Sequence, residues 1–326
     1  MFDFHLPDSL IARHPPASRD GGRLLHLGPA GDSHRAIREL PELLAPGDLL
    51  VANDTRVMRA RVPARRSSGG GVEVFLLGPG PGPVRALLRP ARRLKVGERL
   101  RVGEGWVELR ERHEDGQWTV ICQPEPLALM EASGQMPLPP YLGREADDQD
   151  SQRYQTTYAR EAGAVAAPTA GLHLSEELRA RLLARGVGFA TITLHVGIGT
   201  FRPLRPEDLE RGLLHPEHYE VPQATIEAIA GARRVIAVGT TTTRALESAC
   251  VHGVLAAGTG VTRLFIREGY RFQVVDGLLT NFHLPGSSLL MLVCALGGRE
   301  RLARAYGEAI QRGYRFYSYG DAMLLL

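Results

Sequence analysis

Three histidines in this sequence stand where an apolar run ends in small and polar residues. His173 follows AAPTAGL, His195 lies near the end of FATITLHV ahead of Gly197 and Gly199, and His283 follows TNF. A neutral imidazole can accept a proton near neutral pH, so histidines of this kind are candidates for general bases. For each of them, a purely structural hydrogen-bonding role is the competing interpretation.

Among the three we favour His173 as the base, because Ser175 is predicted to cap a helix directly after it. The positive end of that helix disfavours an imidazolium and keeps the ring neutral. His195 and His283 stay as alternatives that could instead orient a substrate. Asp321, in the C-terminal SYGDAM segment, is a further catalytic candidate, because a carboxylate can accept hydrogen bonds from the hydroxyl groups of a ligand.

The segment VIAVGTTTTRALES predicts a strand, a glycine turn and the start of a helix. Backbone amides and hydroxyls at such a turn could hold a carboxylate or a nucleotide oxygen, and an arginine adds a bidentate donor. A capped turn without a ligand is the competing interpretation. The full set of candidate substrate-binding residues comprises Asn53, Asp54, Thr55, Arg56, Thr169, Gly171, Gly197, Gly199, Gly239, Thr240, Thr241, Arg244 and Asn281.

Several kinds of chemistry are disfavoured by the composition. Lys95 is the only lysine and does not follow a glycine, so a Walker-type phosphate loop is absent. The three cysteines are far apart, which argues against a disulfide framework and against zinc or iron–sulfur sites built from clustered cysteines. The HPEHYE segment (215–220) lacks a zinc-binding helical spacing, and its proline disfavours a helix, so we interpret it as a loop. We therefore predict no metal site.

The elements that must position these residues alternate between strands and helices in the second half of the chain. A short buried strand at 49–52 precedes the polar turn at 53–55. Later strands are predicted at 189–196 and 234–238, with a hairpin around Glu268 and Gly269. Helices are predicted from Ser175 to Gly186 and at 223–231, 241–252, 286–297 and 299–312, with two short strands closing the chain. This alternation is typical of a sheet covered by helices.

Residues 57–122 have a different character, with short strand-like segments separated by Gly, Pro and charged turns, which favours a small barrel or sandwich. Between Arg56 and Arg112 fourteen Arg and Lys residues stand against five Glu residues. We predict that Arg92 and Arg93 contact the phosphates of a nucleic acid, although an arginine-rich genome or a solvated face would also explain this surplus. The fold prediction is a larger α/β domain (1–56 and 153–326) with an inserted small β-barrel domain plus connector (57–152).

The bulk composition is that of an ordinary globular protein, with 44% hydrophobic and 23% charged residues among 326. No apolar run approaches the ~18 residues that span a bilayer, and the N-terminus lacks the pattern of a secretory signal. We expect a cytoplasmic protein with no membrane partner, and we expect a monomer.

Taken together, these segments resemble the S-adenosylmethionine:tRNA ribosyltransferase-isomerases of queuosine biosynthesis, and the resemblance covers essentially the whole chain. Its carriers include FDFHLP, LPELLAPGDLLVANDTRV, GGGVEVFLL, GQMPLPPYL, RYQTTYA, GAVAAPTAGLHL, TLHVGIGTFRP, HPEHYEV, RVIAVGTTTTRALES, TNFHLPGSSLLMLV and YSYGDAMLL.

The resemblance implies that the ribosyl group of S-adenosylmethionine is transferred to 7-aminomethyl-7-deazaguanine at the wobble position of tRNA and rearranged. The implied products are epoxyqueuosine in tRNA, adenine and methionine. S-adenosylmethionine is then a co-substrate, and no metal or redox cofactor is implied. A non-catalytic RNA-binding protein and a metabolite enzyme without an RNA partner remain the two alternatives.

Overall fold

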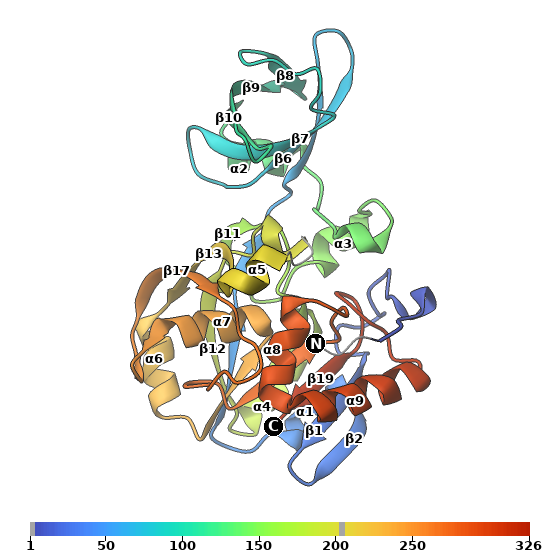
Figure 1. Cartoon of the computed structure of the whole chain (residues 1–326), viewed down its shortest axis with the longest axis vertical. Coiled ribbons are helices and arrows are strands. Elements are labelled where there is room, and N and C mark those ends of the chain that lie inside the picture. Colours follow the sequence, from blue (N-terminus) through green and yellow to red (C-terminus); the bar gives the residue numbers. More distant parts are fainter. Residues whose placement is uncertain (1–3, 202–205) are drawn as a thin grey trace.

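The computed structural model describes residues 4–201 and 206–326, which form a large sheet and a separate small barrel (Figure 1). The large sheet has the strand order β17-β13-β12-β3-β14-β18-β19-β1-β2. The bounds of its strands are β1 (Arg23–Gly28), β2 (Gly31–Ala36), β3 (Asp48–Asn53), β12 (Gly188–Leu194), β13 (Leu213–Val221), β14 (Arg234–Val238), β17 (Gly258–Leu264), β18 (Gly277–Asn281) and β19 (Ala322–Leu325). The predicted α/β fold with a small β-barrel is confirmed.

The central strand β3 is buried on both faces, which is why its sequence reads as a nearly continuous apolar run. Leu49 and Val51 join the hydrophobic core on one face of the sheet. Leu50 and Ala52 join a second core on the other face. The strand is thereby held from both sides, and the residues that follow it have a defined position.

Helices cover both faces of the sheet. The first core packs α7, α8 and α9 against the strands, and the second core packs α1 and α4 against them. The bounds of the helices are α1 (Leu40–Leu43), α2 (Pro126–Ser133), α3 (Asp148–Arg153), α4 (Glu176–Ala184), α5 (Pro206–Arg211), α6 (Gln223–Ala230), α7 (Thr240–Ala249), α8 (Ser288–Gly297) and α9 (Arg299–Gln311). Ser175 caps α4 as predicted, because its side chain accepts a hydrogen bond from the N–H of Leu178.

The barrel lies at one end of the molecule (Figure 1) and closes in the order β10-β7-β6-β5-β8-β9. Its strands are β5 (Arg61–Arg65), β6 (Gly71–Leu76), β7 (Val84–Arg89), β8 (Arg99–Val102), β9 (Gly105–Arg112) and β10 (Trp118–Gln123). Alternate residues of these strands fill its interior, as in other small barrels. Leu129 and Met130 of α2 belong to the same core.

A two-stranded ribbon of β4 (Thr55–Val57) and β11 (Glu161–Ala164) joins the two parts. The chain leaves β3 through β4 to enter the barrel and returns through β11, and the two strands run parallel. A second short pair, β15 (Cys250–Val251) and β16 (Val254–Leu255), forms an exposed hairpin after α7.

The predicted hairpin around Glu268 and Gly269 is wrong. β17 pairs instead with β13, and the segment 265–276 forms no strand. The physical reason is a buried carboxylate in α7. The N–H groups of Gln273, Val274 and Val275 all donate to Glu247, each at 3.0 Å, and so have no need of a neighbouring strand.

The HPEHYE segment, predicted to be a loop, lies within β13. Within the described residues, no helix is both long enough and apolar enough to cross a membrane.

Candidate active site

The polar strand ends identified in the sequence meet along one edge of the large sheet. β12, β3, β14 and β18 run parallel, so their carboxyl ends lie side by side. β13 is antiparallel to β12, and β19 is antiparallel to β18, so both begin at this same edge. In open α/β sheets ligands bind at the carboxyl ends of strands, so this edge is the candidate active site.

Asn53 ties the ends of two strands together. Its side-chain Nδ2 donates to Leu194 O (2.9 Å), and its Oδ1 accepts from the N–H groups of Leu194 (3.0 Å) and Thr55 (3.1 Å). Nδ2 also lies 3.4 Å from the hydroxyl of Thr241 at the start of α7. Asn53 is fully buried, so it holds the ends of β3 and β12 together from the interior of the protein.

Asp54 is buried and paired as well. Thr193 donates to one carboxylate oxygen (2.7 Å), and the guanidinium of Arg160 donates to the other (2.6 Å). Arg160 had not been singled out in the sequence. A buried carboxylate with such partners holds the end of β3 against β12, so the predicted substrate contact of Asp54 has to compete with these bonds.

Thr55 and His195 form a hydrogen-bonded pair. Thr55 Oγ1 lies 2.8 Å from His195 Nδ1 and donates to the backbone carbonyl of Glu161 at 3.3 Å. The imidazole packs against β11, because a Cβ added at Gly163 would lie 2.5 Å from its Nδ1. Burial lowers the pKa of His195, and the neighbouring His218 lowers it further.

Gly239 makes the turn between β14 and α7 with a φ of 92°, a left-handed value that glycine adopts without strain. One helical turn further on, Arg244 is buried, with only 6% of its surface exposed. Its Nη1 pairs with Glu217 of β13, and its Nε donates to Leu264 O at 3.0 Å. Its Nη2 has no hydrogen-bond partner among the described residues.

Glu217 is a site residue that the sequence interpretation missed. Its carboxylate accepts from the backbone N–H of Gly197 (3.2 Å) as well as from Arg244. A period of two in HPEHYEV aligns Glu217 with Tyr219 and Val221 on the inward face of a strand. That alternation was the available signal, since a carboxylate on the buried face of a strand needs a cationic partner.

His173 is buried and has partners at its ring. Asn281 Nδ2 lies 3.1 Å from His173 Nε2 and also donates to Tyr317 O (3.1 Å), which fixes the orientation of the amide. Burial lowers the pKa of His173 to about 4, against a smaller opposing effect of Asp321. The ring is neutral, as the sequence indicated, but burial is the cause rather than the start of α4.

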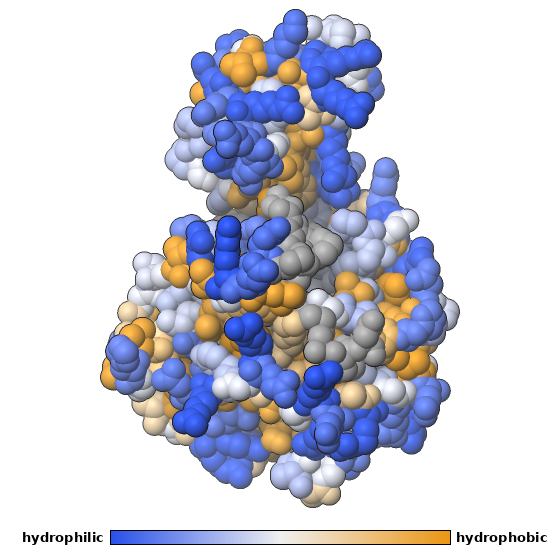
Figure 2. Space-filling view, in the orientation of Figure 1, coloured by the Kyte–Doolittle hydropathy of each residue, from blue (hydrophilic) through white to orange (hydrophobic). Residues whose placement is uncertain are grey.

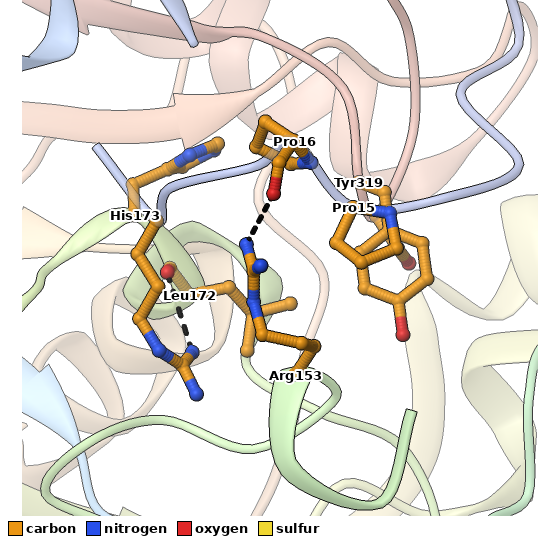
Figure 3. Close-up of a pocket in the computed structure, with 8 residues that line it drawn as sticks. Pro15, Pro16, Arg153, Leu172, His173 and Tyr319 are labelled. Atoms are coloured by element: carbon orange, nitrogen blue, oxygen red, sulfur yellow. Dashed lines mark hydrogen bonds between the residues drawn. The ribbon is translucent and has the colours of Figure 1, made fainter. Parts of the chain in front are cut away.

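A small pocket lies beside His173 (Figure 3). Arg153 crosses it and donates to Pro16 O at 2.7 Å, with Tyr319 on the far side from the histidine. The pocket has room for little more than a water molecule. A substrate-sized molecule does not fit in this pocket, so it would have to bind elsewhere along this edge of the sheet.

His283 and Asp321 are held by neighbouring groups. His283 Nε2 lies 2.8 Å from Thr280 Oγ1, and loss of surrounding water lowers its pKa to about 4, although part of the residue reaches the surface. Asp321 is 1% exposed, and both of its oxygens accept bonds from Arg23 (2.9 and 3.1 Å). The backbone N–H of Arg315 also donates to Asp321, so the structure gives this carboxylate a role in fixing the start of β19.

The remaining candidates lie around the same edge, with one exception. A Cβ at Gly171 would come within 2.1 Å of Tyr158 Oη, so this glycine is required by close packing. Thr169 begins a short 3-10 helix (Thr169–His173), Thr240 begins α7, and Gly199 packs against a histidine ring of β13. Arg56 points elsewhere, and its partner is Glu131 of α2 at 3.4 Å.

No cluster of three or more potential metal ligands occurs among residues 4–201 and 206–326. The three cysteines, Cys122, Cys250 and Cys294, are all free thiols, and burial raises the pKa of each.

Comparison with known proteins gives a consistent answer. A family model described as Queuosine biosynthesis protein matches residues 1–325. An S-adenosylmethionine:tRNA ribosyltransferase-isomerase of Gloeobacter violaceus is 51% identical, over 100% of this chain and 95% of the relative. One of Aromatoleum aromaticum is 49% identical, over 99% and 96%. The crystal structure of an S-adenosylmethionine tRNA ribosyltransferase from Thermotoga maritima has 37% identity and a TM-score of 0.58, covering 100% of this chain and 99% of the other.

A helix-covered sheet whose carboxyl edge gathers histidines, threonines and a buried arginine is the arrangement of an α/β enzyme. This chain belongs to the queuosine biosynthesis protein family. The resemblance identified from the sequence is thereby confirmed.

Proposed function

We propose that this enzyme transfers the ribosyl group of S-adenosylmethionine to 7-aminomethyl-7-deazaguanine at the wobble position of tRNA and isomerises it. The products are epoxyqueuosine in tRNA, adenine and methionine. The observation that carries the proposal is full-length identity of about half to proteins named for this activity. Its monomeric state and cytoplasmic location stay predictions.

The turn between β14 and α7 supports a site for S-adenosylmethionine. Amides at the start of α7 have no partner within the helix, and such groups favour an anionic oxygen. Arg244 Nη2 is a buried donor with no partner in the described part of the chain, and buried donors of this kind are normally satisfied. We assign the methionine carboxylate, or a nucleotide oxygen, to this turn and this donor.

The barrel supports contacts to tRNA. Figure 2 shows hydrophilic side chains gathered over this end of the molecule. Arg65 of β5 and Arg101 of β8 lie directly opposite each other, although like charges in that position repel. Arg92 and Arg93 are exposed, and no described carboxylate forms an ion pair with them. A polyanion would reduce the repulsion between Arg65 and Arg101 and would supply negative charges for Arg92 and Arg93.

The chemistry requires acid–base groups rather than a metal. A sulfonium makes the neighbouring sugar C–H bonds more acidic, so that a positioned base can begin the rearrangement. The attacking amine must also lose a proton. The edge of the sheet provides three histidines, and burial lowers the pKa of each, so that their rings are neutral near pH 7.

The reaction is tested by incubating the protein with S-adenosylmethionine and tRNA that bears the aminomethyl base, in the presence of a chelator. Adenine and methionine should form in equal amounts, and unmodified tRNA should give neither. An RNA-binding protein without activity would release no adenine, and a metabolite enzyme would turn over without tRNA. Methyl transfer, or a strict requirement for a metal, would refute the proposal.

A further inference from the structure

A groove of about 270 Å³ is lined by residues of β12, β13 and β17 and by His195. Two rows of side chains cross its floor. Thr193, Glu220 and Thr259 form one row, and His195, His218 and Val261 form the other. Among the described residues, no arginine or lysine lines the groove, and Glu220 is its one anionic side chain. Glu220 is exposed and forms no ion pair with a described cation.

The tautomer of His195 follows from its contact with Thr55. The Thr55 hydroxyl has one hydrogen, which it donates to the carbonyl of Glu161 (3.3 Å). For both contacts to be hydrogen bonds, the same oxygen has to accept at 2.8 Å from His195 Nδ1, and in this arrangement Nδ1 carries the proton. Nε2 is then the nitrogen with a free lone pair, so the ring is oriented and tautomerically set as a proton acceptor.

In the other two candidate histidines, a neighbouring side chain already contacts Nε2. His173 Nε2 already accepts from Asn281, whose orientation is fixed by its bond to Tyr317 O. His283 Nε2 is engaged by Thr280 at 2.8 Å. No described group hydrogen-bonds to His195 Nε2, and the residue lines an open groove, whereas His173 lines a pocket of about the size of a water molecule.

Resting on the proposed function, we propose that this groove binds the amine-bearing side of the substrate, that His195 Nε2 accepts a proton from its ammonium group, and that Thr55 is the positioning residue. In this step R–CH2–NH3⁺ loses one N–H proton to Nε2 and becomes R–CH2–NH2, and His195 becomes an imidazolium. The lone pair left on nitrogen is the nucleophile. Glu220 faces the cation before the transfer, and both charges stay within one groove.

The groups around His195 are compatible with this step. Burial lowers its pKa below the ordinary value of about 6.5, and His218 across the groove acts in the same direction. Glu161 of β11, Asp54 at the end of β3 and Glu220 of β13 act in the opposite direction. The ring is therefore neutral at pH 7, and the carboxylates stabilise the imidazolium once it forms.

The test is single-turnover kinetics with tRNA that bears the aminomethyl base. His195→Asn keeps an amide N–H near the position of Nδ1 and removes the basic nitrogen, and should slow turnover by about 10²–10⁴-fold. His252→Asn, at the exposed turn between β15 and β16, is the matched control and should leave the rate unchanged. Glu220→Gln should weaken binding of aminomethyl tRNA by about 2- to 5-fold, without affecting unmodified tRNA.

The role of Thr55 is tested by the pH profile. In the wild type, log(kcat/KM) should fall as pH drops through the pKa of His195, and this limb should vanish in His195→Asn. Thr55→Val should lower kcat by about 10- to 100-fold, as for other groups that orient an imidazole, and Thr55→Ser should restore it. In ¹⁵N spectra of labelled histidine, Thr55→Val should shift the His195 tautomer away from protonated Nδ1.

The outcomes separate the two proposals. No adenine release by the wild type would refute the function itself. An active wild type with an equally fast, stably folded His195→Asn would overturn the assignment of the base alone. A weaker affinity of His195→Asn for S-adenosylmethionine, with unchanged affinity for aminomethyl tRNA, would overturn the assignment of the groove to the amine.

Discussion

The buried pair of Arg244 and Glu217 links three elements of the site at the level of single residues. Arg244 comes from α7, Glu217 from β13, and the pair also contacts the backbone of Gly197 and Leu264. Both side chains are more than nine-tenths buried. A buried ion pair contributes little net stability, but removing one partner leaves the other charge uncompensated.

Arg244→Ala should therefore lower the free energy of unfolding by about 3–5 kcal/mol. The sequence indicated Arg244 only as a candidate substrate-binding residue, and its pairing with Glu217 adds a structural role. The double variant Arg244→Met with Glu217→Leu should recover much of the loss, because an apolar pair needs no counter-charge. Urea unfolding of the three proteins is the measurement.

The affinity for S-adenosylmethionine is better measured with Arg244→Lys, which keeps a positive charge beside Glu217 but loses the second guanidinium donor. A loss of less than about 1 kcal/mol in Arg244→Ala would show that solvent reaches the pair. The designation of this pair as buried would then be incorrect.

At the scale of elements, the ribbon of β4 and β11 connects the barrel to the chemistry of the edge. β4 carries Thr55 and β11 carries Gly163, and both contact the His195 imidazole. The ring lies so close to β11 that only a residue without a side chain fits beside it. The ribbon is therefore a positioning element as well as a connection.

Gly163→Ala should displace the His195 ring and slow turnover by about 10²-fold, the effect of a misplacement of about 1 Å. The new Cβ would lie 2.5 Å from His195 Nδ1, and the ring has the open groove to move into, so thermal stability should change little. Gly307→Ala in α9 is the matched control, since its Cβ would meet no atom within 4 Å. Equal activity of the two variants would argue against a fixed ring.

At the scale of the whole molecule, the barrel and the edge of the sheet lie on the same side, with the ribbon between them (Figure 1). An elongated polyanion could contact the barrel while one of its bases reaches the groove. This division separates backbone binding from chemistry, so the two should respond differently to salt and to mutation.

Replacing Arg92 and Arg93 by Ala should weaken binding of tRNA and spare binding of S-adenosylmethionine. Each lost phosphate contact should reduce the slope of log K against log salt by about 0.7–0.9. Filter binding between low and high salt measures the slope. Arg304→Ala on α9, at the opposite end of the molecule, is the control. An unchanged slope in the barrel variants would mean that these arginines are merely solvated.

Much of this protein could be predicted from local patterns in the sequence. The continuous apolar run of β3, the cap at Ser175 and the glycine turn before α7 depend on near neighbours, so periodicity and turn chemistry predict them. The short, closely spaced strands predicted the barrel, and the ordered motifs predicted the family.

What only the tertiary structure decided was which groups meet. Glu217 and Arg244 are 27 positions apart, and Thr55 and His195 are 140 apart, so no local pattern indicates either pair. Glu247 satisfies three N–H groups that would otherwise have formed a strand. The choice among the histidines depends on the same kind of contact, because the partner of one ring nitrogen determines whether the other can accept a proton.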